Sequence, residues 1–304
     1  MATPIVTTGN FPELLWPGLF EIWGDSYKDD ALVFPKIFQQ EKSKQRFEKL
    51  QQVAPTGLAK IKTEGSEIFY DNPLHGYPVE FTHVVYALGS QITKEMWSDD
   101  LYREMAKIPR WLARSLMHTE ETTHSNVLND SFTSSTSPPS PDGVSLINAS
   151  HPLLNGTTLS NQPTTMTDLT ETSLSQARID IGKFVDDRGL RINVQGRLLL
   201  TPIDLEPTAA KVLNSHYEVD TANNAINPVY NYVPFQSWKY LTDTDAWFIV
   251  TDAEDGLISF ERWAAEFDRD NHFDTKNLRF SATKRWSQGY GDFRGLYGSS
   301  GGTS

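Results

Sequence analysis

The chain contains no cysteine, and this absence excludes disulfide bonds, thiolate metal ligands and cysteine nucleophiles. Positive charge is also scarce, because 27 Lys and Arg residues stand against 39 Asp and Glu, for a net charge of −12. A free-standing nucleic-acid-binding protein is therefore not expected, since neutralising a phosphate backbone needs clustered Lys and Arg. The acidic balance instead favours solubility at high concentration and keeps the surface from adhering to a nearby polyanion.

Long apolar runs are missing as well, and none approaches the ~18 residues of a membrane-spanning helix. The N-terminus, MATPIVTTGNF, has neither the basic nor the apolar region of a secretory signal. The expected compartment is therefore the cytoplasm of the producing cell, and no membrane partner is expected. The motifs G-x-G-x-x-G, Walker A and G-x-S-x-G are absent too.

Acidic residues supply the few candidates for a chemical site. The segment that starts at Asp268 resembles the beginning of a calcium loop, but Phe273 and Arg279 occupy the positions that need Gly and Glu. A carboxylate-based hydrolase stays open as an alternative, since glycosidases act through two carboxylates at a set separation. Its candidate residues are Asp243, Asp245, Asp252, Glu254 and Asp255.

A second candidate group lies near the middle of the chain, where two His and two Glu residues follow each other closely. Their spacing is not the H-E-x-x-H of zinc sites, and no third ligand on the same helix is apparent. We therefore expect a solvated helix end at this position. The four residues are His118, Glu120, Glu121 and His124.

Aromatic residues make up 12% of the chain and can supply much of a core, because each ring buries about 150–250 Å². Many of these rings lie in residues 1–30, where Pro12 and Pro17 discourage one long helix. Such a segment would be costly to leave in water. It either folds back on the core of its own chain or forms an arm that packs on a neighbouring subunit.

Local patterns predict a mixture of helices and strands. Residues 36–51 indicate a short, charged helix. Residues 52–80 indicate an exposed two-stranded excursion, with turns at Glu64-Gly65 and Asn72-Pro73, that leads into a core strand at Phe81–Leu88. A lone hairpin of this kind is marginal in water, so we expect it to lie on something else.

A long helix is expected from Ile92 to about Asn126, kinked or restarted at Pro109. Residues 257–267 fit a helix by their spacing, although tertiary pairing can turn such a segment into a strand. The other expected elements are a helix at 168–185 capped by Thr167 or Thr170, a strand at 197–202, a helix opened by Asp204 or Pro207, strands at 233–241 and 246–251, and a closing strand at 279–286.

Lys and Arg are absent between Arg114 and Arg178. In the middle of this span, residues 131–143 read SFTSSTSPPSPDG and are rich in hydroxyl groups and proline, as loops and disordered links are. This shift in composition has two interpretations. It marks a domain boundary, or it is an ordered surface loop that carries few charges because it faces another subunit.

From Ser145 onward, short sequence words follow one another in a specific order and spacing. They are His151-Pro152, Asn155-Gly156, FVDDRG at 184–189, Leu198–Pro202, LEPTA at 205–209, Asn224 through Pro228, DTDAW at 243–247, Gly256-Leu257 and RGLYG at 294–298. In these words the chain resembles the major capsid proteins of tailed bacteriophages, of the type found in Mu-like phages. The resemblance covers about half of the chain, and the first half is similar in layout.

The resemblance implies the Hong Kong 97 fold, an α+β capsid fold with an N-terminal arm, an extended β-hairpin loop, a peripheral domain with a long spine helix, and an axial domain. The implied segments are 1–35 for the arm, 36–80 for the short helix and extended loop, 81–164 for the peripheral domain with its spine helix and polar loop, 165–274 for the axial domain, and 275–304 for the return strand of the peripheral domain and the C-terminal tail. Some relatives carry a cleaved helical scaffold before the arm. This chain has no room for one, so we expect a separate scaffolding protein and no large N-terminal processing.

The resemblance further implies a structural head protein that is not an enzyme and has no cofactor or metal. Its copies are expected to form the hexamers and pentamers of an icosahedral shell, which encloses the phage double-stranded DNA without sequence-specific binding. The expected partners are a scaffolding protein and a portal as separate chains, with a decoration protein as a further candidate. The expected location is the virion, after assembly in the bacterial host cytoplasm. The alternatives are an encapsulin-like cellular nanocompartment shell and the hydrolase.

Candidate residues for the subunit interface come from the arm, the extended loop and the quoted words. Arm and loop are the segments that need a neighbour on which to lie. The candidates are Trp16, Phe20, Trp23, Phe69, Tyr70, His75, Asp186, Arg188, Trp247 and Arg294.

Overall fold

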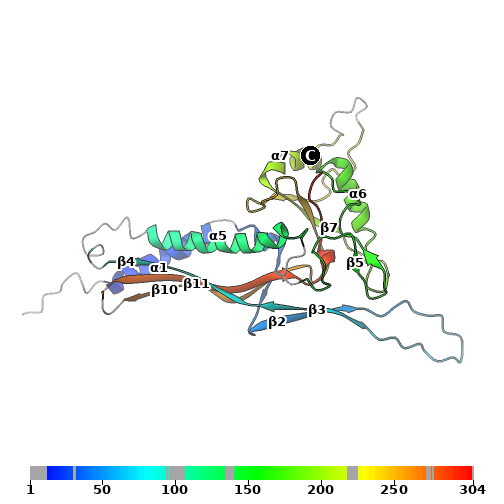
Figure 1. Ribbon diagram of the computed structural model, residues 1–304, viewed down its shortest axis with the longest axis horizontal. Coiled ribbons are helices and arrows are strands. Elements are labelled where there is room, and N and C mark those ends of the chain that lie inside the picture. The colour runs from blue at the N-terminus through cyan, green and yellow to red at the C-terminus, as the bar shows by residue number, and fades with distance from the viewer. Residues whose placement is uncertain are drawn as a thin grey trace, which may run out of the picture.

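The computed structural model describes residues 12–29, 32–93, 95, 107–133, 140–217, 225–271, 275 and 277–302, and within the first helix the side chains of residues 18–27. Figure 1 shows an elongated molecule with a long flat body, a second lobe that stands at one end of it, and a loop that projects away from both. Helices and strands both contribute, so the predicted α+β class is confirmed. Within the described residues, no helix combines the length and apolar character needed to cross a membrane.

The flat body is built on a four-stranded sheet with the order β1-β10-β11-β4, in which β1 is parallel to β10 and the other neighbours are antiparallel. Its strands are β1 (Gln39–Lys42), β4 (Val84–Ile92), β10 (Leu257–Asn271) and β11 (Leu278–Tyr290). Helix α5 (Lys107–Asn129) runs along the sheet (Figure 1). Alternate residues of β11, such as Phe280 and Trp286, are buried with Leu112 and Leu116 of the helix.

The ambiguous segment 257–267 is a strand, because β10 pairs with β11 along most of its length. Cross-strand pairing supplies backbone hydrogen bonds that helical spacing within one segment does not reveal. β10 therefore shares a sheet with β11 and β4, although the expected axial domain extends to residue 274. The expected segment boundaries stay a prediction, and this sheet favours an axial segment that ends before Leu257.

Residues 36–51 do not form the expected helix. A short helix, α2 (Phe34–Ile37), is followed by β1 and then by β2 (Phe47–Ala54). β1 extends the long sheet beside β10, and β2 pairs with β3 (Leu74–Thr82). Exposed and partly buried residues alternate along β2, which is the two-residue period of a strand. The high local charge concealed this period in the sequence.

The N-terminal segment is one helix, α1 (Pro12–Asp29), despite its two prolines. Pro17 lies inside the helix, where it removes one hydrogen bond of the ladder, and Pro12 is the first described residue of α1. The Trp23 ring is buried and stacks on the ring of Phe267 in β10, with 5.7 Å between the ring centres. Of the two interpretations of this segment, the described part of α1 supports packing on the core of its own chain.

The expected helix from Ile92 is described from Lys107 onward. Ile92 ends β4, and α5 continues unbroken past Pro109 to Asn129. Residues 96–106 lie outside the described part of the chain. The expected kink or restart at Pro109 stays a prediction, because the chain just before Lys107 is not described.

The second lobe is built on a smaller sheet with the order β12-β9-β7-β8. Its elements are α6 (Glu171–Ile181), β7 (Gly196–Thr201), the short 3-10 helix η2 (Ile203–Leu205), α7 (Glu206–Asn214), β8 (Phe235–Ser237), β9 (Trp247–Thr251) and β12 (Leu296–Ser299). Each expected helix and strand of this lobe has a counterpart, although α6 is shorter than 168–185 and the strand expected at 233–241 covers only Phe235–Ser237. Thr170 caps α6 as predicted, because its side-chain oxygen accepts the N–H of Ser173 at 3.1 Å.

The predicted two-stranded excursion is present at its base, where β2 and β3 pair from Phe47 and Thr82 to Ala54 and Leu74. Beyond these strands, residues 55–73 form the projecting loop of Figure 1. The expected core strand Phe81–Leu88 is divided between β3 and β4 at His83. The ring of His83 is buried and hydrogen-bonded to Ser43 and Ser287, which holds the chain at this bend.

The polar tract 131–143 is attached to the core at its first end. The carbonyl of Ser131 accepts the N–H of Ile147 at 2.8 Å, and Phe132 packs on Phe248 of β9. Residues 134–139 lie outside the described part of the chain. The expected loop is therefore described at its two ends.

The second end of this tract is attached by a buried pair, Asp142 and His151. The Asp142 carboxylate is 2.6 Å from Nδ1 of His151, whose ring stacks on Phe293 at 3.7 Å. Burial acts to raise the pKa of Asp142, but hydrogen bonds from His151 and Ser140 outweigh burial and lower that pKa. The pair therefore favours an ionised Asp142 in the folded chain.

Candidate assembly surfaces

The projecting loop, residues 55–73, exposes large apolar side chains. Ile61 is 97% exposed and Tyr70 is 85% exposed, and among the described residues no core cluster includes them. The other exposed apolar side chains of the loop are Leu58, Ile68 and Phe69. Apolar side chains gathered on one projecting segment mark a surface that another molecule covers. The loop is therefore the first candidate assembly surface.

The base of this loop is closed by hydrogen bonds to Asp71. Oδ2 of Asp71 accepts the N–H of Gly57 at 2.8 Å, which joins the outgoing and returning halves of the loop. The same oxygen lies 3.0 Å from Nη1 of Arg188, whose Nη2 donates to the carbonyl of Asn72 at 2.5 Å. The hydrogen bond from Gly57 and the charge of Arg188 lower the pKa of Asp71. Arg188 thus connects the loop to the second lobe.

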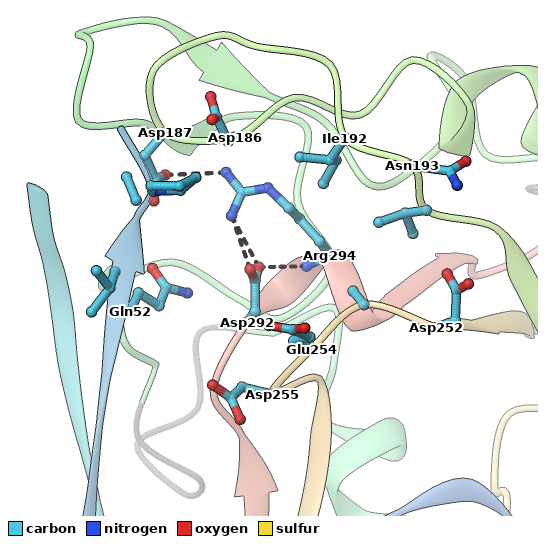
Figure 2. Close-up of a pocket in the computed structure, with 15 residues that line it drawn as sticks. Gln52, Asp186, Asp187, Ile192, Asn193, Asp252, Glu254, Asp255, Asp292 and Arg294 are labelled. Atoms are coloured by element: carbon cyan, nitrogen blue, oxygen red, sulfur yellow. Dashed lines mark hydrogen bonds and ion pairs between the residues drawn. The ribbon is translucent and has the colours of Figure 1, made fainter. Parts of the chain in front are cut away.

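A pocket of about 380 Å³ lies between the second lobe, the base of β2 and the turn before β10. Figure 2 shows the Arg294 guanidinium between two carboxylates, with Nη2 3.1 Å from Asp187 and Nη1 3.0 Å from Asp292. Nε of Arg294 donates to the carbonyl of Val185 at 2.8 Å. Burial acts to lower the pKa of Arg294, but Asp292 and Asp187 outweigh burial and raise it. Arg294 is therefore a permanent cation that ties the chain at Val185–Asp187 to the turn at Asp292.

The opposite wall of this pocket carries Asp252, Glu254 and Asp255 (Figure 2). These are three of the five carboxylates that the hydrolase alternative needed, while Asp243 and Asp245 do not line the pocket. Within the described residues, no group of three His, Asp or Glu side chains is arranged to hold a metal ion. The positive charge in the pocket is already neutralised by its own carboxylates, so the arrangement is that of a structural joint.

The middle of α5 carries a buried charged cluster rather than the expected solvated helix end. Glu120 is 1% exposed, lies 2.9 Å from Nζ of Lys284 in β11, and accepts a hydrogen bond from the Tyr27 hydroxyl of α1. Burial and the charge of Glu120 raise the pKa of Tyr27, which keeps this hydroxyl a donor. The prediction was wrong because partners from α1 and β11, remote in sequence, satisfy the charge.

Glu121 joins α5 to the chain that leaves the arm and to the second lobe. Its carboxylate accepts the backbone N–H groups of Val33 and Phe34 and the indole N–H of Trp238. Burial raises the pKa of Glu121, and these hydrogen bonds offset only part of the effect. His124 completes the cluster, because its ring stacks on Phe34 and burial lowers its pKa to about 3.

The spacing of residues along α5 indicates this burial in the sequence. Leu112, Leu116, Glu120 and His124 follow at intervals of four residues, so the two polar residues continue the apolar stripe of α5. His118 lies off this stripe, is exposed, and is hydrogen-bonded to the hydroxyl of Tyr240.

The ten predicted interface residues differ in their exposure within the single chain. Trp23, Trp247, Asp186 and Arg294 are buried within the subunit, where they have little or no surface to offer a second subunit. Phe20, Phe69, Tyr70 and His75 are exposed, Arg188 is bound to the loop base, and Trp16 lies in α1 with its side chain outside the described part. For the exposed residues of α1, the loop and β3, a role in the subunit interface stays a prediction.

A family of known proteins, described as phage capsid proteins, matches residues 76–299. The chain belongs to the phage capsid protein family. The capsid chain is similar to the solved procapsid of bacteriophage JBD30, with a TM-score of 0.52 and 11% identity over 98% of this chain and 77% of that one. No curated protein matches the sequence.

Two further solved structures have the same fold as this capsid protein. The capsid of cyanophage P-SCSP1u has a TM-score of 0.55 and 9% identity over 88% of this chain and 87% of that one. A chain from Mycobacterium phage Patience has a TM-score of 0.54 and 11% identity over 96% of this chain and 89% of that one. The Hong Kong 97-type fold is thereby confirmed.

The protein is a structural major capsid protein, as the sequence resemblance implied. It is a component of the virion and assembles with other subunits into a capsid shell. Neither the nanocompartment shell nor the hydrolase is favoured by these matches.

Proposed function

We propose that this capsid protein forms hexamers and pentamers that close an icosahedral shell around double-stranded DNA, and that loop 55–73 makes the principal contact with a neighbouring subunit. The observation that carries the proposal is the row of exposed apolar side chains on a loop that the described part of its own chain leaves uncovered. Each subunit in a closed ring contacts several others, so contacts of a few kcal/mol sum to a stable shell.

The remaining partners follow from the charge and the family. A net charge of −12 suits a shell that encloses DNA without binding it tightly or reading its sequence. A scaffolding protein and a portal act as separate chains during assembly in the bacterial cytoplasm, and a decoration protein is a further partner of the outer surface.

The test replaces Ile61, Phe69 and Tyr70 together by serine. Because these side chains are exposed in the single chain, the melting temperature should stay within about 2 °C of the wild type, as surface substitutions usually do. Electron microscopy should show shells or capsomers for the wild type and unassembled subunits for the variant.

A matched control replaces exposed isoleucines outside the loop, Ile179, Ile203 and Ile226, by serine. This control should assemble as the wild type does. Normal shells from the loop variant, or a strictly monomeric wild type at high concentration with its scaffold present, would contradict the proposal.

A further inference from the structure

In the part of the chain that the structure describes, the side chain of Arg188 attaches the loop base to the second lobe. Its guanidinium contacts the Asp71 carboxylate and the Asn72 carbonyl, and Asp71 also holds Gly57 on the opposite half of the loop. These four residues are called the Arg188 clamp below. Within the described residues, they provide the polar link between the loop and the second lobe that the structure records.

The turn that presents Arg188 is itself held by several hydrogen bonds. Oδ1 of Asp186 accepts the backbone N–H groups of Arg188 and Leu190 at 2.9 and 2.8 Å, and the N–H of Asp186 donates to the carbonyl of Leu190. Gly189 has a φ of 83°, a conformation that favours glycine, so the turn closes without strain. Arg188 is therefore presented from a rigid support.

The loop beyond the clamp projects far from this rigid support. Its apex at Gly65 is about eight residues from Gly57, so an extended loop reaches up to about 30 Å past its base. A rotation of about 10° at the base then moves the apex by about 5 Å, which is larger than a side-chain contact distance. A small change at the clamp is therefore amplified at the place where the loop meets its neighbour.

We propose that the Arg188 clamp sets the direction of the extended loop relative to the second lobe, and that this direction determines how accurately the loop reaches the neighbouring subunit. Arg188 is thus a positioning residue within its own subunit, in place of the intersubunit contact expected from the sequence. The consequence for assembly rests on the proposed function of the loop. The effect on loop direction belongs to the single subunit and stands apart from it.

Close approach at Gly57 supports a tight clamp. A Cβ atom at position 57 would lie 3.3 Å from Oδ2 of Asp71 and 3.5 Å from Nη1 of Arg188. Most of the Arg188 side chain is buried, with 18% exposed, so the guanidinium has few other positions to occupy. By contrast, the ion pair of Lys49 and Glu80 on β2 and β3 has exposed partners and adds little order.

The experiment measures the loop direction inside one subunit. Since the chain has no cysteine, Glu67→Cys in the loop and Ile179→Cys on α6 give two unique spin-label sites. Labelled chains are diluted into excess unlabelled chain, and pulsed electron paramagnetic resonance records the distance distribution between the labels. The compared variants are the parent, Arg188→Ala, Asp71→Ala and Lys49→Ala.

The proposal expects a distribution about twofold broader or shifted for Arg188→Ala and Asp71→Ala, because loop motion is no longer limited by the clamp. Lys49→Ala should match the parent. Asp71→Ala removes the contact from the loop side, so it keeps the test valid even where Arg188→Ala fails to fold. Unchanged distributions in both clamp variants would overturn the proposal.

Electron microscopy of the same variants, without labels, tests the consequence for assembly. Broader distances together with irregular or open shells support both proposals. Broader distances together with normal shells support the proposal for the Arg188 clamp but contradict the loop's role in assembly. The failure of one proposal is therefore distinguishable from the failure of the other. Arg188→Lys keeps the charge but loses the two-point contact, and should fall between the parent and Arg188→Ala.

Discussion

Individual buried charges connect the parts of this capsid subunit. Arg294 is held by Asp187 and Asp292, and Glu120 is held by Lys284, so no charge of these two clusters lacks a partner. Removing one partner of such a pair leaves an uncompensated buried charge, which is costlier than the pair itself is stabilising. At this scale the polar contacts determine which segments meet, while the apolar core supplies most of the stability.

The Asp142–His151 pair gives a pH-dependent prediction at the residue scale. Asp142→Asn should lower the free energy of unfolding at neutral pH by about 1.5–3 kcal/mol, the usual value for a hydrogen bond to a charged group. Because the folded pKa of Asp142 lies below its ordinary value of 3.8, the unfolded chain takes up the proton first as the pH falls. The contribution of this carboxylate is therefore present above about pH 4 and lost below it.

Urea unfolding of both proteins at pH 6, 4 and 3 checks this prediction. The difference in free energy between the wild type and Asp142→Asn should shrink as the pH falls through the lowered pKa. A difference that stays constant over this range would show that Asp142 does not titrate as the geometry implies.

Helix α1 shows how one element combines a buried face with an exposed one. Trp23 stacks on Phe267 and, at 5.4 Å between ring centres, on Tyr27, while Phe20 on the same helix is 48% exposed. The helix is therefore attached to the flat body through Trp23, while about half of the Phe20 side chain is exposed to solvent. The sequence predicted both rings as interface residues of an arm. In the structure, Trp23 is buried by packing and Phe20 is exposed.

This division predicts opposite effects for two substitutions in α1. Trp23→Ala should lower the free energy of unfolding by about 3–5 kcal/mol, the usual cost of truncating a buried aromatic side chain. Phe20→Ala should leave stability nearly unchanged and reduce assembly, which light scattering measures. Trp23→Phe serves as the control, since it keeps the stacking and removes an indole N–H that has no hydrogen-bond partner among the described residues. Equal losses of stability from the two alanine variants would refute the division.

The whole molecule is a flat body, a standing lobe and a loop whose apolar surface its own chain leaves open in the described residues. Such a shape is incomplete as a monomer, because exposed apolar surface is stabilised only when another molecule covers it. The strong negative charge works against this, since every pair of subunits repels. Assembly is therefore a balance between apolar contact at short range and repulsion at longer range.

This balance predicts that salt accelerates assembly. Between about 10 mM and about 100 mM NaCl the screening length falls from about 30 Å to about 10 Å, which weakens repulsion between subunits of charge −12. The initial rate of assembly, followed by light scattering, should rise several-fold over this range. KCl at the same ionic strength should act equally. A rate that falls with added salt would mean that attractive ion pairs between subunits control the process.

Much of the fold could be predicted from local features of the sequence. The cap at Thr170, the strand at 197–202 and the turn-rich excursion at 52–80 depend on neighbours a few residues away, and the structure shows all three. The exposed loop residues Phe69 and Tyr70 were also predicted from the sequence, as members of an extended loop that needs a neighbour on which to lie.

The sequence by itself determined the α+β fold class, the acidic charge, the absence of disulfides and the family of this protein. These properties depend on composition and on the order of short sequence motifs. Tertiary structure alone decided that 39–42 and 257–267 join one sheet, that Glu120 and His124 are buried, and that Arg188 binds the loop of its own subunit. The reason is that strand pairing and charge burial depend on partners far away along the chain. Those partners meet only after the chain has folded.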